Sequence, residues 1–191
     1  FAVVLGYMLD QGALGAAESK TAFSGSAAYK KDALYVGVAY EMLSKGYAAL
    51  TDSTFGEAQT GLRATAKYDF GTFALAGLFQ ALSDVGGIAS ASAQTFGLEG
   101  KFSFNDKYAA KAAYYMADPN TDVDNDDYSL LALGVDRQLG QKTYMYLQYG
   151  MVMNGDASMA ALGGPGHGSS IAASAAGESP TGFSWGMVTK F

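Results

Sequence analysis

Strict alternation of large apolar residues with small or polar residues, repeated along the chain, is the feature that most constrains the fold. Between positions 181 and 191, large apolar side chains occupy every second place except Thr189: Phe183, Trp185, Met187 and Phe191. Side chains of a β-strand point alternately to its two faces, so this segment is predicted to be a strand with one apolar face. A helix would scatter the same residues around its axis.

Two further segments repeat the pattern with charges on the polar face. Residues 95–104 set Phe96, Leu98, Phe102 and Phe104 against Thr95, Glu99, Lys101 and Ser103. Residues 61–70 set Leu62, Ala64, Ala66, Tyr68 and Phe70 against Arg63, Thr65, Lys67 and Asp69. Weaker alternation elsewhere completes a prediction of about ten strands, the others being residues 1–9, 21–31, 33–42, 72–83, 107–117, 128–138 and 142–153.

The connections between these segments alternate in length. Tight turns are predicted at four dipeptides: Lys31-Asp32, Phe70-Gly71, Asn105-Asp106 and Leu139-Gly140. Longer gaps rich in Asp, Ser and Gly separate the other strands, at residues 10–20, 43–60, 84–94, 118–127 and 154–180. This rhythm predicts an up-and-down antiparallel sheet with short turns at one end and long surface loops at the other.

The polar face distinguishes a membrane barrel from a soluble sandwich. A soluble sheet exposes a face dense in Lys, Glu, Arg and Thr, whereas much of this face is Gly, Ala and Ser. Aromatic residues gather near the turns, where they would meet lipid headgroups: Tyr29, Tyr68, Phe70, Phe73, Phe104 and Tyr108. We therefore interpret the chain as an all-β transmembrane antiparallel β-barrel, residues 1–191 forming one domain. A soluble β-sandwich binding module is the alternative, and solubility without detergent would select it.

Composition excludes several other classes. A net charge of −6 and a pI near 4.6 argue against nucleic-acid binding, which needs clustered Lys and Arg. With no Cys and one His, a zinc site is excluded, and no usable phosphate-binding loop is present, so we expect no cofactor. His167 lies in a Gly-rich loop that supplies no fixed geometry beside Ser169, so we expect no enzymatic activity.

Three stretches resemble a known family. They are Ala-Ala-Tyr-Lys-Lys-Asp-Ala-Leu at 27–34 with Val-Gly-Val-Ala-Tyr at 36–40, Leu-Gly-Val-Asp at 133–136 with Lys142, Thr143 and Tyr146, and the closing strand 182–191. Together they resemble the general trimeric, sixteen-stranded porins of Gram-negative bacteria. The resemblance implies that these are strands seven to sixteen, with the first six strands and the inward-folded constricting loop missing before Phe1. A stand-alone ten-stranded barrel is the alternative, because the strand count is even. The resemblance also implies a homotrimer in contact with outer-membrane lipid and lipopolysaccharide, and recognition of Phe191 by the barrel-assembly machinery.

Charged residues at the polar positions are candidates for lining a pore. The bases are Arg63, Lys67, Lys101 and Lys111, and the acids are Glu41, Asp69, Glu99 and Asp136. Opposed charges in a water-filled pore would bias which ions enter it, and Arg63, Lys67 and Lys111 are the preferred candidates. Alternation would equally serve to keep these charges out of lipid, where Lys or Arg at the midplane costs about 2–4 kcal/mol.

An acidic stretch is the other candidate site. Asp118, Asp122, Asp124, Asp126 and Asp127 fall in one predicted external loop, and carboxylates suit Ca²⁺ or Mg²⁺. The stretch lacks the Gly and the closing Glu of an EF-hand, so a solvated acidic loop is favoured and Asp122, Asp124 and Asp126 are only weak calcium candidates. A bound cation would bridge to lipopolysaccharide phosphates.

Two functional hypotheses remain for a membrane barrel. The first is an outer-membrane porin, a water-filled channel for passive diffusion of ions and small hydrophilic solutes. The second is a structural or adhesive barrel whose lumen is plugged and whose loops bind a partner. Bulky residues at the polar positions would favour the second, and the observed Gly, Ala and Ser favour the first.

Overall fold

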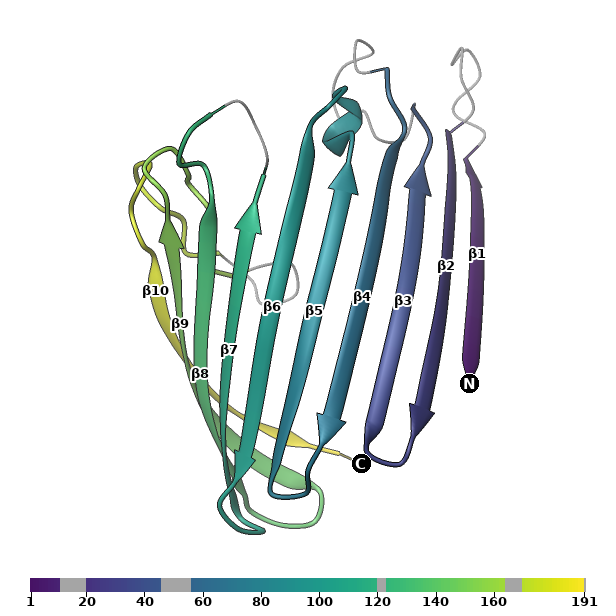
Figure 1. Cartoon of the computed structure of the whole chain (residues 1–191). Helices are drawn as coiled ribbons and strands as arrows, with labels where there is room; N and C mark the ends of the chain where they lie inside the picture. Colours follow the sequence, from purple (N-terminus) through teal and green to yellow (C-terminus); the bar gives the residue numbers. More distant parts are fainter. Residues whose placement is uncertain (11–19, 46–55, 120–122, 164–169, 191) are drawn as a thin grey trace. The chain divides into compact units, whose positions relative to one another are not determined.

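A computed structural model describes residues 1–10, 20–45, 56–119, 123–163 and 170–190. Its described elements are ten strands and one short 3-10 helix, η1: β1 Ala2–Asp10, β2 Lys20–Lys31, β3 Leu34–Leu43, β4 Gln59–Asp69, β5 Phe73–Ser83, η1 Val85–Gly87, β6 Ser92–Ser103, β7 Tyr108–Asp118, β8 Tyr128–Gln138, β9 Thr143–Asn154 and β10 Thr181–Thr189. The strands form one sheet in sequence order, β1 to β10 (Figure 1). The all-β antiparallel prediction is confirmed.

Strand positions follow the alternation closely. The segment 128–138 was predicted to the residue, and all four tight turns lie between consecutive strands. The largest difference at a strand start is β6, which begins at Ser92 rather than at residue 95. Residues 92–94 are Ser, Ala and Gln, so no large apolar side chain marks the period there, although the backbone is already paired.

Side chains of the turn residues fix the tight connections. Asp69 Oδ1 accepts the Gly71 N–H at 2.9 Å, and Gly71 has a φ of 89°, a conformation that suits glycine. Asn105 Oδ1 accepts the N–H groups of both Lys107 and Tyr108, at 2.9 and 3.0 Å. These bonds satisfy backbone donors where the strand ladder stops.

The chain divides into two compact units. Unit 1 comprises residues 1–66, 78–95 and 119–122, and unit 2 comprises residues 67–77, 96–118 and 123–191. In unit 1, β1, β2 and β3 pair antiparallel, with Tyr7 opposite Phe23 and Tyr29 opposite Val36. The β5–β6 connection of the same unit holds η1, where Gln59 Oε1 accepts the Gly86 N–H at 2.9 Å.

Unit 2 shows how register builds two chemically different faces. Strands β7 to β10 pair so that Ala112, Leu133, Tyr149 and Phe183 form one row across the sheet. The adjacent row, which points to the opposite face, consists of Lys111, Gly134, Gln148 and Ser184. We call the face with the first kind of row the apolar face and the face with the second kind the polar face.

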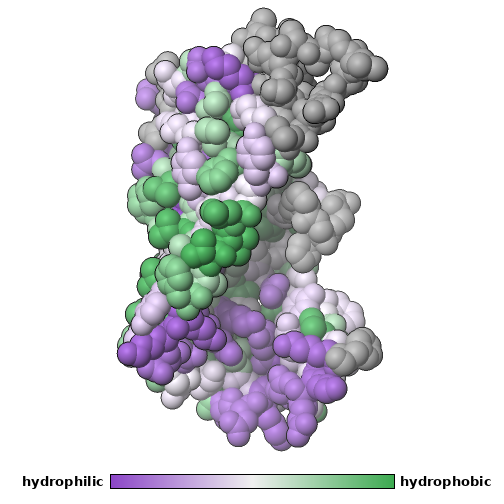
Figure 2. All heavy atoms as spheres, turned by 90° about the vertical axis from the view of Figure 1, so that its right-hand side faces the viewer, coloured by the Kyte–Doolittle hydropathy of each residue, from purple (hydrophilic) through white to green (hydrophobic). Residues whose placement is uncertain are grey.

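The apolar face is exposed. Phe183, Trp185 and Leu98 expose 79%, 76% and 62% of their surface, and the only buried hydrophobic residues in the described part are Ala109, Val152 and Ala173. Figure 2 shows hydrophobic residues gathered around the middle of the side on which β1 lies. A water-soluble domain would bury such side chains in a core, so this face requires apolar surroundings.

No helix within the described ranges is long and apolar enough to span a bilayer.

Aromatic rings cluster beside the tight turns of unit 2. Phe70 stacks on Phe73 with ring centroids 4.3 Å apart, and Phe102 meets Phe104 edge-on at 5.1 Å. The Arg137 guanidinium lies 5.8 Å from the Tyr108 ring. Aromatic rings at the ends of the strands are typical of the interfacial girdles of membrane barrels.

Thr189, which interrupts the apolar pattern of the closing strand, has a structural explanation. It pairs with Thr143 across β9 and β10, and the two hydroxyl oxygens are 3.2 Å apart. The hydrogen bond satisfies a polar group at the turn end of the strand, so a larger apolar residue is not required.

The described parts of the β9–β10 connection, residues 155–163 and 170–180, have hydrogen bonds and buried side chains of their own. Asn154 holds them, since its amide N–H₂ donates to the carbonyls of Ala160 and Glu178 at 3.0 and 2.7 Å. Asn154 Oδ1 accepts the Ala160 N–H and the Ser158 hydroxyl, and Ser158 and Ala173 are buried. Sequence predicted only an exposed loop, because side-chain contacts of Asn154 with residues 4, 6 and 24 positions away leave no periodic signal.

We predict that Leu147→Lys, near the middle of β9 on the apolar face, destabilises the folded protein by about 2–4 kcal/mol in lipid vesicles. The matched change Gln148→Lys places the same charge one residue along, on the polar face, and should cost much less. Guanidinium unfolding followed by circular dichroism would measure both. Equal losses would show that the two faces do not differ in their surroundings.

Candidate functional site

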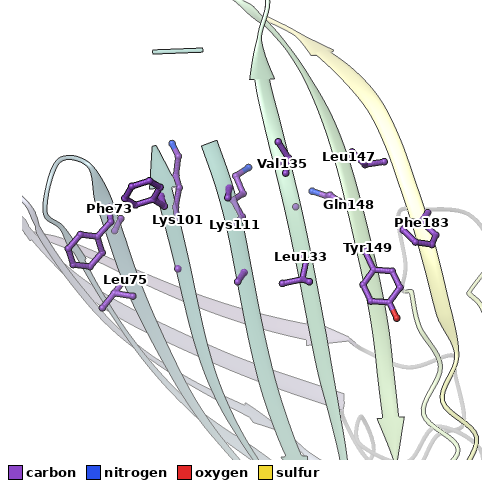
Figure 3. Close-up of a pocket in the computed structure, with 16 residues that line it drawn as sticks. Phe73, Leu75, Lys101, Lys111, Leu133, Val135, Leu147, Gln148, Tyr149 and Phe183 are labelled. Carbon is purple, nitrogen blue, oxygen red and sulfur yellow. The ribbon is translucent and has the colours of Figure 1, made fainter. Parts of the chain in front are cut away.

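The polar face of unit 2 carries small residues, a few charges and some large side chains, among them Tyr115 and Tyr146. Lys101 on β6 and Lys111 on β7 share this face with Gln148, and these three side chains are labelled in Figure 3. Gly134 of β8 lies between Lys111 and Gln148 in the same row. At the turn end, a hollow of about 550 Å³ is lined by polar groups that include Lys101, Ser103 and Asp136. A second depression, of about 610 Å³, is lined mainly by residues of the apolar face, such as Leu133 and Tyr149.

Lys111 and Asp136 form an ion pair on the polar face. The register places Lys111 opposite Gly134, so that the lysine can reach Asp136 of β8. The Asp136 side chain is only 18% exposed, and within the described part its Oδ1 is buried without a hydrogen-bond partner. Lys111 therefore compensates a carboxylate that is largely removed from water.

Other predicted candidates in unit 2 have different surroundings. Glu99 accepts a hydrogen bond from the Tyr115 hydroxyl. Asp69 serves the β4–β5 turn by accepting the Gly71 N–H. Lys101 lies in the hollow at the turn end, and neither Lys67 nor Lys101 has an ion pair with any described residue.

Unit 1 holds the remaining two candidates. The Arg63 guanidinium donates from Nε to Gln80 Oε1 at 2.8 Å, and its Nη2 contacts the same oxygen. Gln80 is neutral, so the positive charge of Arg63 is oriented but not cancelled. Glu41 lies opposite Ser24, which lies opposite Gly6, in a row of otherwise small side chains.

Sequence analysis missed the polar partners of these charges. Gln80 and Tyr115 occupy polar-face positions, so alternation alone could have placed them there. The charge that each of them contacts could not be predicted in the same way. The contact between Arg63 and Gln80 depends on how neighbouring strands are aligned, and the two-residue period of the sequence does not determine that alignment.

The acidic stretch gives no metal centre in the described residues, where no three His, Cys, Asp or Glu side chains are grouped to hold a metal ion. Asp122 lies outside the described residues, so the weak calcium site of Asp122, Asp124 and Asp126 stays a prediction. His167 and Phe191 also lie outside them.

Glu178, in the β9–β10 connection, has a pKa below its ordinary value. The Ser174 hydroxyl and N–H, with the Ala175 N–H, donate to its carboxylate and lower its pKa. A lowered folded-state pKa means that this contribution to loop stability is complete above the ordinary pKa and is lost as pH falls through the lowered one.

Comparison with known proteins now identifies the family. A family model described as Gram-negative porin matches residues 1–157. The chain belongs to the Gram-negative porin family. The fold is accordingly that of porin barrels, and the protein is located in the bacterial outer membrane. Porins of this family are generally trimeric.

Solved structures agree with the family. The chain is similar to an anion-selective porin from Comamonas acidovorans, with a TM-score of 0.81 and 22% identity over 99% of this chain and 55% of that one. It is also similar to OmpT, an outer membrane protein of Vibrio cholerae folded in vitro, with a TM-score of 0.62 and 15% identity over 97% and 63% of the two chains. This porin therefore spans little more than half the length of these structures. No curated protein sequence matches it.

We predict that Lys111→Ala destabilises the porin by about 1–3 kcal/mol, because it leaves the poorly exposed Asp136 carboxylate uncompensated. The double variant Lys111→Ala with Asp136→Ala should recover much of the loss. Lys67→Ala, which removes an unpaired lysine, is the control. Additive effects of the two substitutions in a double-mutant cycle would contradict coupling between them.

Proposed function

We propose that the protein is a porin whose polar face lines a water-filled channel for passive diffusion of ions and small hydrophilic solutes. The observation that carries the proposal is the separation of the two faces. Large apolar side chains cover the exposed face, whereas Gly, Ala, Ser and a few charges form rows on the other. Such rows leave space beside the wall for water and solute.

The charges on the polar face supply the proposed selectivity. Lys111 and Asp136 compensate each other, so their separate fields largely cancel. Arg63, Lys67 and Lys101 keep positive charge on the wall, and Glu41 and Glu99 keep negative charge. We propose that these five residues set the ion selectivity of the channel. Lys111, which the sequence suggested as a candidate for this role, is not among them.

A barrel with a restricted lumen is the second candidate. It is favoured by one observation: the side chains of Leu162 and Ile171, from the β9–β10 connection, lie against glycines of the polar face. The extent of this obstruction decides between an open porin and a plugged structural or adhesive barrel.

The proposal also covers the partners of the protein and states that it catalyses no reaction. A homotrimer, contacts with lipopolysaccharide and recognition of Phe191 by the barrel-assembly machinery agree with membership of the porin family. The continuous strand order β1 to β10 supports one barrel domain. Passive diffusion needs no cofactor, metal or covalent step, and we propose no enzymatic activity.

We predict stepwise, ohmic currents from the natively purified protein in a planar bilayer. A polar wall open to water conducts in proportion to voltage and salt, and the reversal potential under a salt gradient gives the ion preference. Heat-modifiability on electrophoresis is the control for correct folding. Silence from folded, inserted protein would reject the porin function and favour the plugged barrel.

We also predict that Lys101→Glu shifts the reversal potential toward cation selectivity. One unit charge acts on an ion 10 Å away in water with about 0.4 kcal/mol, so a two-unit change alters the permeability to a monovalent ion about fourfold at low salt, in opposite directions for cations and anions. High salt should reduce the shift. Lys31→Glu, the same charge change beside the β2–β3 turn, is the control. Equal shifts from both variants would show that position on the polar face is irrelevant.

A further inference from the structure

We propose that the described parts of the β9–β10 connection, residues 155–163 and 170–180, are a constriction element of the channel, and that Leu162 and Ile171 fix them to the pore wall. The inference rests on the proposed porin function and assigns a size filter to this chain. Every part of it lies in unit 2.

Leu162 and Ile171 form a two-residue clamp. They make an isolated antiparallel bridge, in which each N–H donates to the other residue's carbonyl, at 2.9 and 2.7 Å. Their side chains therefore project from a hydrogen-bonded pair of backbones rather than from two independent loops.

Two glycines show where the clamp lies. A Cβ placed on Gly150 would be 3.0 Å from Leu162 Cδ1, and one placed on Gly182 would be 2.8 Å from Ile171 Cδ1. The Gly182 position is also 3.2 Å from Leu162 Cδ2. The clamp thus occupies the space directly over these glycines, where a larger residue would displace it.

Register shows that this is the polar face. Gly150 and Gly182 belong to a row with Ala113 and Ala132, in which every side chain is small. The row lies two residues along the strands from the row of Lys111 and Gln148, on the same face, at a spacing of about 7 Å. A solute moving along the wall would pass the apolar clamp next to the charged row.

Contacts of the described residues on both sides of the clamp hold it in place. Asn154 ties both ends of the connection, the Val152 N–H donates to the Pro180 carbonyl at 3.0 Å, and Gly177 donates to Ser158 at 3.0 Å. Val152, Ser158 and Ala173 are among the few buried residues of the described chain. A connection with its own buried contacts keeps its position in a flow of solute better than a solvated loop does.

Displacing the clamp is the first test. Gly182→Leu should force Ile171 and Leu162 from the wall, and the double variant Leu162→Ser with Ile171→Ser should weaken the same contact without crowding the sheet. Both should raise single-channel conductance and shift the exclusion limit in liposome swelling toward larger sugars. Gly134→Ala is the control, because a Cβ there has room, 3.4 Å from its nearest neighbour, Gln148 Cγ.

Accessibility of Leu162 is the second test, and it holds even if the displaced variants fold poorly. The chain has no cysteine, so Leu162→Cys would be its single thiol. A membrane-impermeant, bulky thiol reagent should reduce the open-channel current of this variant. Met159→Cys, on the same connection and 56% exposed, is the labelling control.

Outcomes separate this inference from the porin function. The constriction would be overturned if the Gly182→Leu and double serine variants fold with unchanged conductance and exclusion limit, and if labelling of Leu162→Cys leaves the current unaffected. Ohmic currents from the wild type would still uphold the porin function in that case. A silent wild type opened by the double serine variant would overturn both the open porin and its partial constriction, and would identify the connection as a plug. Silence of all variants would overturn both.

Discussion

Pairing of backbone hydrogen bonds between neighbouring strands is the constraint on which the structure depends. In hydrocarbon an unpaired N–H or C=O costs several kcal/mol, so a spanning sheet must satisfy its backbone through adjacent strands. The continuous order from β1 to β10 does this along the chain, and the side chains of Asp69 and Asn105 take over at the tight turns. Once the backbone is satisfied in this way, side chains are free to specialise by face.

That specialisation links packing to function. The apolar face is large and exposed, which water would not tolerate and lipid stabilises, whereas many positions of the polar face hold small residues or charges, beside larger side chains such as Tyr115 and Tyr146. Small residues serve two purposes on that face. Gly134, which lies opposite Gln148, leaves room at the wall. Gly150 and Gly182, which lie side by side, make room for Leu162 and Ile171 of the β9–β10 connection. The same composition that suggested an open lumen thus also accommodates an obstruction.

Electrostatics on the polar face depends on pairs rather than on single residues. Alternation placed Lys111 and Asp136 on one face as two independent candidates, but their contact makes them one compensated unit. Arg63 differs, because Gln80 orients its guanidinium and leaves its charge in place. The eight candidates of the sequence therefore divide into a compensated ion pair, a turn residue and charges that have no ion pair among the described residues.

By itself, the sequence determined the strands, the turns, the two faces and the family resemblance, because the period of two is a local property that each segment carries independently. Segment 128–138 and the four turns were predictable for that reason. Only the tertiary structure decided which residues meet across strands, as in the pair Lys111 and Asp136, and where the β9–β10 connection lies. Those contacts depend on strand register and on the Asn154 network, which join residues far apart in sequence and leave no periodic signal.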